Sequence, residues 1–216
     1  MELNLIQKIA IFALPVIFAI TLHEAAHGYA ALRFGDRTAQ SEGRISLNPL
    51  RHIDLVGTII VPALTIMLGG ILFGWAKPVP VDFNNLNNPK KDMFWVAAAG
   101  PLANLAMALF WGAVVKLALM MPPNAYTHPL ALMGMAGITI NAILAALNLL
   151  PLPPLDGGRI AVSLLPPGPA YTLARIEPYG MFILIALVMT GLLGSILGPL
   201  YQGIEALVHS LFNLFS

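Results

Sequence analysis

The sequence predicts an all-α polytopic membrane protein with about four to six transmembrane helices, and three observations support this fold class. Of the 216 residues, 58% are hydrophobic and only 10% are charged, whereas about 25% of the residues of a typical soluble chain are charged. The mean hydropathy is +0.80. The apolar residues also gather in runs near the roughly 20 residues that a helix needs to cross a bilayer. We therefore expect a protein that resides in lipid.

Charge and cysteine content exclude several functions. Eleven basic residues balance ten acidic ones, so no strongly basic surface is available for nucleic acid. The chain has no cysteine, which excludes disulfides, cysteine-ligated zinc and thiol nucleophiles. Histidine and carboxylate side chains must therefore carry any chemistry.

Five apolar runs and one amphipathic stretch are predicted as helices. The runs cover residues 5–31, 55–75, 94–121, 130–150 and 179–197, and the amphipathic stretch covers residues 200–215. The polar connections between them are too short to hold a soluble domain. We predict a single membrane-embedded domain over residues 1–216, with its core at 5–160 and C-terminal helices at 179–215.

The first polar connection contains a segment of alternating character at residues 43–50. Its polar and apolar side chains alternate with a period of two, which predicts a short β ribbon. The polar members are Arg44, Ser46 and Asn48, and the others are Ile45, Leu47 and Pro49.

The first apolar run contains His23-Glu24-Ala25-Ala26-His27, which fits the pattern H-E-x-x-H. On a helix, this spacing places both imidazoles on one face, about 6 Å apart along the axis. Zinc suits neutral imidazole, and with three protein ligands it keeps a position for a water whose pKa it lowers to about 7. Glu24 lies beside that face and is the candidate general base. We expect one zinc ion per chain.

Ionisable groups in a transmembrane helix need compensation, because each costs about 3 kcal/mol on insertion scales. This helix carries three such groups within five residues. A metal ion would compensate them, and a hydrogen-bonded His-Glu-His cluster without metal is the alternative.

Asp156 is the candidate third ligand. It follows several prolines in the segment 149–159, where prolines disfavour a helix and two glycines permit close approach to another element. Alone, Asp-Gly is usually a turn, but an intramembrane H-E-x-x-H needs a partner. The other acids of the polar connections have an ordinary solvated interpretation. These are Asp36, Glu42, Asp54, Asp82 and Asp92.

Three motifs occur in a characteristic order: HEAAH at 23–27, AAGPLANL at 98–105 and NLLPLPPLDGGR at 148–159. Together they resemble the site-2 protease family of intramembrane zinc metalloproteases. The resemblance implies that His23, His27 and Asp156 bind zinc and that Glu24 is the general base. It also implies that Asn148 helps to hold the substrate carbonyl or its oxyanion.

The same resemblance implies cleavage of peptide bonds in or near transmembrane segments of membrane-protein substrates. No PDZ-like or nucleotide-sensing domain is evident, so we expect a minimal form of the family. Substrate choice would then rest on membrane helices and short loops, on an unseen adaptor or on a homo-oligomer.

Two asparagines and one glycine-proline pair have simpler interpretations as well. Asn148 could cap a helix end. Asn104 could face the substrate or form an interhelical hydrogen bond. Gly100-Pro101 is predicted to begin a helix.

The charge distribution predicts the topology. If residues 55–75 enter the membrane and return, His27 and Asp156 meet on one side, which also holds nine of the eleven basic residues. If that run crosses, the basic residues divide six against five. We therefore predict a re-entrant segment and an active site toward the cytoplasmic side of the cell membrane. The nine are Arg33, Arg37, Arg44, Arg51, Lys77, Lys90, Lys91, Arg159 and Arg175.

The predicted ribbon suggests how an unwound substrate could bind. An extended peptide can pair with an exposed strand, and Ile45 and Leu47 would then contact the substrate. The competing functional hypothesis is a non-proteolytic membrane zinc-binding or metal-transport protein, because intramembrane histidine and glutamate also line ion pathways.

Overall fold

The computed structural model describes residues 4–60 and 76–214, and every regular element among them is helical. The membrane-protein fold class is thereby confirmed as all-helical. The elements are α1 (Leu5–Arg33), α2 (Thr38–Ser41), η1 (Pro49–Arg51), η2 (Leu55–Ile60), η3 (Phe83–Asn85), α4 (Pro89–Met120), α5 (Thr127–Asn148), α6 (Asp156–Leu164), α7 (Pro167–Ala174), α8 (Glu177–Met189) and α9 (Leu192–Phe212).

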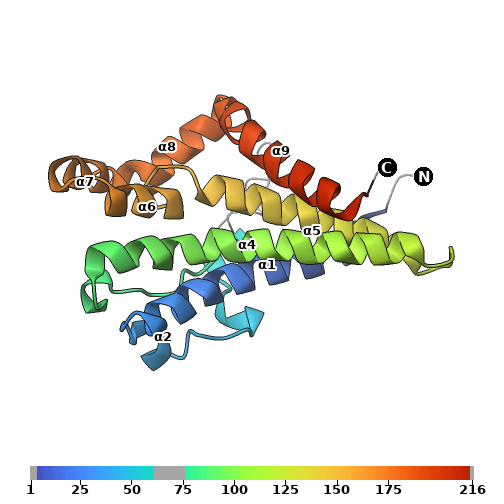
Figure 1. The fold of residues 1–216 in the computed structure, drawn as a ribbon, viewed down its shortest axis with the longest axis horizontal. Coiled ribbons are helices and arrows are strands. Elements are labelled where there is room, and N and C mark those ends of the chain that lie inside the picture. Colours follow the sequence, from blue (N-terminus) through green and yellow to red (C-terminus); the bar gives the residue numbers. More distant parts are fainter. Residues whose placement is uncertain (1–3, 61–75, 215–216) are drawn as a thin grey trace.

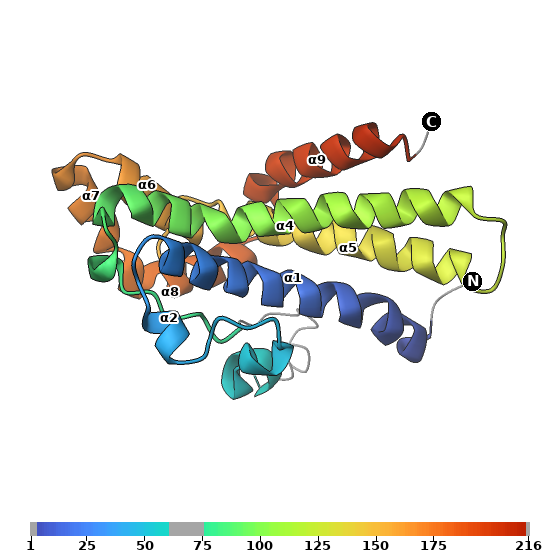
Figure 2. The same cartoon turned by 60° about the horizontal axis from the view of Figure 1, so that its bottom comes forward.

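The core of the molecule consists of α1, α4 and α5, which run side by side (Figures 1 and 2). Helix α4 is central, and it contacts α1 on one side and α5, α6 and α9 on others. Each of the three long helices is apolar and long enough to cross a membrane, and the bent pair α7–α8 makes a fourth candidate span. Within the described residues this gives three or four spans, at or below the lower end of the predicted range.

Small residues let the central helices approach closely, which is the usual basis of helix packing in lipid. A methyl group added at Gly137 of α5 would collide with the ring of Trp111 on α4. One added at Gly112 of α4 would collide with Val208 of α9. Trp111 and Val208 are both buried in this core.

Two helix boundaries differ from the predicted ones. Gly100-Pro101 does not begin a helix, because α4 begins twelve residues before Pro101, at Pro89. Asp92 supports that earlier start, since its carboxylate accepts a hydrogen bond from the Asn88 amide at 2.7 Å. The predicted helix 179–197 is two helices, because Gly191 adopts φ +73° and ends the first of them.

The β ribbon at 43–50 is not confirmed, since the described residues contain no strand. Hydrogen bonds that involve side chains hold this segment, in place of the backbone hydrogen bonds of a β ribbon. The guanidinium of Arg44 turns inward and donates to the carbonyls of Lys77 and Pro78, and His52 Nε2 lies 2.8 Å from the Ser46 carbonyl.

The predicted re-entrant segment at 55–75 falls largely outside the described residues. The residues on either side of it are in contact, because the Lys77 amide donates to the His52 carbonyl at 3.0 Å. Residues 52 and 77 therefore lie next to each other. Further along the chain, the Asn87 amide donates to the Phe34 carbonyl, so α4 begins beside the end of α1.

Candidate metal centre

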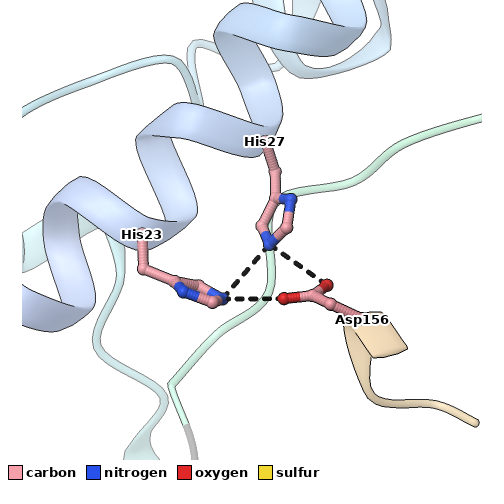
Figure 3. Close-up of side chains that lie close together, drawn as sticks. All are labelled: His23, His27 and Asp156. Carbon is pink, nitrogen blue, oxygen red and sulfur yellow. Dashed lines mark hydrogen bonds and ion pairs between the residues drawn. The ribbon is translucent and has the colours of Figure 1, made fainter. Parts of the chain in front are cut away.

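His23, His27 and Asp156 converge on one point (Figure 3). The two Nε2 atoms are 3.1 Å apart. Asp156 Oδ2 lies 3.3 Å from Nε2 of His23, and Asp156 Oδ1 lies 3.3 Å from Nε2 of His27. The histidines extend from successive turns of α1, and the carboxylate comes from the first residue of α6.

Close approach of the chain to itself positions Asp156. Added methyl groups at Gly157 and Gly158 would overlap the Leu149 carbonyl and the backbone of Pro153, so α6 can begin here only with glycines after the aspartate. Asp156 is therefore a helix residue at the end of a proline-rich segment, and not part of a non-helical stretch.

The outer nitrogens of the two histidines determine which tautomer each ring adopts. His27 Nδ1 lies 2.8 Å from the Val96 carbonyl, which can only accept, so this nitrogen carries the hydrogen. His23 Nδ1 lies 2.6 Å from Asn104 Oδ1, which also accepts. In the neutral rings, both Nε2 atoms therefore present lone pairs toward Asp156.

This donor set fits a zinc ion. Two lone pairs and a carboxylate face one another, and Asp156 Oδ2 is buried without a hydrogen-bond partner. Buried acceptors without donors are costly. A proton on one imidazole would leave the other acceptors without a partner, whereas a bound cation would interact with both imidazoles and the carboxylate. Two imidazoles and one carboxylate form a recognised set of catalytic zinc ligands, which leaves a fourth position for water.

Gly100 of α4 keeps the space beside these three side chains open. A Cβ at this position would lie 2.7 Å from Nε2 of His23 and nearer still to Nε2 of His27. Any other residue would therefore push an imidazole out of place. The sequence contains this residue as the glycine of AAGPLANL, but the pattern alone predicts only a helix start there.

Glu24 is next to the site but is not one of its three converging residues. Its Oε2 accepts a hydrogen bond of 2.7 Å from the Val79 amide, in the loop 76–82. Arg44 holds that loop through the carbonyls of Lys77 and Pro78, at 3.0 and 3.3 Å. The sequence does not reveal that Arg44 holds this loop, because the alternation around it indicates a ribbon.

The remaining predicted site residues lie outside the converging group. Asn148 is the last residue of α5, and its amide donates to the Leu144 carbonyl at 3.0 Å. Leu47 is exposed and borders an apolar groove of about 310 Å³ between α1 and α4. Ile45 packs near Gly28 of α1. Asn104 contacts His23 directly, and contact of any of these four with substrate stays a prediction.

Asp36 and Asp92, interpreted as solvated from the sequence, are both buried. Asp36 accepts hydrogen bonds from the Thr38 amide and hydroxyl, the Asp82 amide and Asn85. Burial raises the pKa of the Asp36 carboxyl, but these hydrogen bonds outweigh it and hold the pKa below its ordinary value.

The chain is similar to known zinc metalloproteases. The model of peptidase family M50 matches residues 121–191, which include Asp156. A Bacillus subtilis protein named "Putative zinc metalloprotease YwhC" is 38% identical over 211 residues, covering 94% of this chain and 90% of the relative. No solved structure matches.

Two mycobacterial relatives have similar names. "Putative zinc metalloprotease Rip2" of Mycolicibacterium smegmatis is 31% identical over 189 residues, covering 86% of this chain and 70% of the relative. The Mycobacterium tuberculosis H37Rv protein of the same name is 31% identical over 188 residues, covering 86% and 69%. The chain therefore belongs to peptidase family M50, the site-2 protease family, and is a membrane zinc metalloendopeptidase.

Proposed function

We propose that this protease hydrolyses peptide bonds in or near transmembrane segments of membrane proteins, with His23, His27 and Asp156 as the zinc ligands. The observation that carries the proposal is the convergence of two imidazole lone pairs and one carboxylate inside a bundle of apolar helices. A protein substrate that reaches ligands placed there must itself enter the membrane region.

Each residue has a defined task in this proposal. When bound, zinc supplies a Lewis acid that activates water and polarises the scissile carbonyl. Glu24 takes the proton of the attacking water at Oε1, since Oε2 is engaged by the Val79 amide, and passes it to the leaving amine. Asn148 exchanges its bond to the Leu144 carbonyl for one to the substrate oxygen, as an oxyanion donor.

The zinc content and the proteolytic activity of Glu24→Gln test the function directly. We expect the variant to retain about one zinc ion per chain, because Glu24 is not a ligand. Cleavage of a model transmembrane substrate should fall by about 10²- to 10⁴-fold, the usual contribution of a general base. Proteolysis that survives the substitution would refute this role. Zinc without cleavage, even in the unmodified protein, would favour the metal-binding or transport alternative.

The segment 43–50 is proposed to accept the unwound substrate as an added strand. Residues 44–46 carry no regular secondary structure, and Leu47 is exposed beside the apolar groove. Leu47→Pro removes a backbone donor and should slow cleavage while zinc content stays constant. Ile45→Pro should act in the same way. Leu47→Ala keeps the donor and serves as the control; equal turnover of the proline and alanine variants would rule out strand pairing.

The active site is proposed to face the cytoplasmic side of the cell membrane. The basic residues near the end of α1 and the start of α4 support this, since those two ends lie together. The chain has no cysteine, so Arg37→Cys in sealed vesicles of known orientation can be labelled selectively. Labelling from the cytoplasmic side is expected, and labelling only from the opposite side would reverse the topology.

A further inference from the structure

Two fully buried asparagines connect the metal centre to the interior of α5. Asn104 of α4 and Asn141 of α5 are both 0% exposed. Asn104 Nδ2 donates to Asn141 Oδ1 at 3.0 Å and to the Ala19 carbonyl of α1 at 3.2 Å. Its Oδ1 lies 2.6 Å from His23 Nδ1. The three long helices of the core therefore share one hydrogen-bonded network, which ends on a predicted zinc ligand.

The direction of every hydrogen bond in this network is determined from its far end. The Gly137 carbonyl can only accept, and it receives a 2.8 Å bond from Asn141 Nδ2. The amide of Asn141 is thereby oriented with its oxygen toward α4, where it receives Asn104 Nδ2. The second acceptor of Asn104 Nδ2, the Ala19 carbonyl, requires the same orientation. Asn104 Oδ1 must then face His23 and accept from Nδ1.

This network selects the tautomer of His23 that can bind metal. With the hydrogen held on Nδ1, Nε2 presents its lone pair toward Asp156. His27 reaches the same state through the Val96 carbonyl, a backbone group that no substitution removes. The direct partner of His23 is a side chain, Asn104, so it can be changed by substitution.

We propose that Asn104 and Asn141 are positioning residues of the zinc centre, with Asn104 acting directly on His23 and Asn141 acting through Asn104. This inference rests on the ligand set of the proposed function. In this proposal Asn104 contacts the zinc ligand His23 and not the substrate, because both the oxygen and the nitrogen of its side-chain amide are hydrogen-bonded to groups of α1 and α5. An ordinary interhelical bond would affect only folding, whereas a positioning role affects metal affinity.

The test measures the affinity of metal-stripped protein for Zn²⁺ alone, by competition with a chelator, together with thermal unfolding of the metal-free form. Asn104→Ala should weaken zinc binding by about 10- to 100-fold, as is typical of outer partners of a ligand. Asn141→Ala should weaken it by a smaller but measurable factor, because the Ala19 carbonyl still accepts from the Asn104 amide. The double variant should bind no more weakly than Asn104→Ala, because Asn141 has no separate route to the zinc. Unweakened binding by Asn141→Ala, or additive losses in the double variant, would overturn the proposal.

Two further variants separate positioning from loss of packing. Ile138→Ala truncates another buried residue of α5 and should lower the unfolding temperature without weakening zinc binding. Asn104→Asp keeps an acceptor for His23 but removes the donor to Asn141. Its zinc affinity should stay within a few-fold of the original and no longer respond to Asn141→Ala. Loss of affinity in Ile138→Ala equal to that in Asn141→Ala would show that packing alone is responsible.

His23→Ala separates failure of this inference from failure of the proposed ligand set. Loss of zinc binding in His23→Ala, combined with full binding in Asn141→Ala, would refute only the positioning role. Full zinc binding in His23→Ala would refute the ligand set, and this inference would fail with it.

Discussion

The two sides of helix α1 hold their functional groups by different means. On the side of the metal centre, His23 and His27 are oriented by groups on α4, with α5 behind them. On the other side, Glu24, the proposed general base, accepts a hydrogen bond from one amide of the loop 76–82. The three proposed metal ligands thus depend on packing between long apolar helices, whereas the proposed general base depends on a connection held by polar side chains.

From this difference we expect that zinc binding and proton transfer by Glu24 can be disturbed separately. A change in the helix packing around α4 should disturb the zinc before anything else. A change in the loop should disturb proton transfer and leave the zinc bound. The following variants test that separation on each side of α1.

Gly100→Ala should have the largest effect, on the metal side. The added Cβ would occupy space within 2.7 Å of His23 Nε2, so one imidazole must move. We expect zinc affinity to fall at least about 100-fold, the upper end of the effect of an outer partner, and cleavage to fall with it. Gly203→Ala in α9 is the matched control, since its added methyl meets no described atom within 4 Å. Normal zinc binding by Gly100→Ala would contradict the geometry.

Arg44→Met should have an intermediate effect, on the base side. It removes the donors that hold the carbonyls of Lys77 and Pro78, so the Val79 amide no longer has a fixed position over Glu24. We expect cleavage to slow about tenfold, or roughly 1.4 kcal/mol, with zinc content unchanged. Arg51→Met is the control, because within the described residues Arg51 donates to the Gly43 carbonyl and not to the loop 76–82. A parallel loss of zinc would show that the two sides are coupled.

Asp36→Asn should have the smallest effect, on stability. The pKa of Asp36 is lower in the folded protein than its ordinary value of 3.8. Its stabilisation is therefore present above pH 3.8 and is lost as the pH falls through the folded pKa. The variant should unfold about 1–2 kcal/mol more easily at pH 7, and this deficit should shrink toward pH 3. The free energy of unfolding is measured in detergent between pH 7 and pH 3, and a deficit that stays constant over this range would contradict the stabilising role of the Asp36 carboxylate. Glu42→Gln, at an exposed position, is the control and should show no such deficit.

The sequence predicted the long helices and the three converging residues well, because both signals are local. Apolar length determines a membrane helix, so the predicted run 5–31 corresponds to α1, Leu5–Arg33. The i, i+4 spacing fixes the relation of His23 to His27 on that helix. Asp156 could be selected because few carboxylates lie in apolar surroundings.

The partners of these residues could not be predicted, because they depend on contacts between helices. Asn141 lies 37 positions from Asn104, and no periodicity indicates that their amides meet. The alternation at 43–50 was misleading for a similar reason. Arg44 occupies a polar position of that pattern, but its partners are carbonyls 33 and 34 residues away and not solvent. Asp36 is buried for the same kind of long-range reason.

X-ray absorption at the zinc edge of the purified protein tests the central claim most directly. The account predicts a zinc ion with two imidazole ligands and oxygen in its remaining positions, and the same spectrum for Glu24→Gln. A first shell with one imidazole or with three, or a shell that changes in Glu24→Gln, would contradict the assignment of His23, His27 and Asp156 as ligands and of Glu24 as the base.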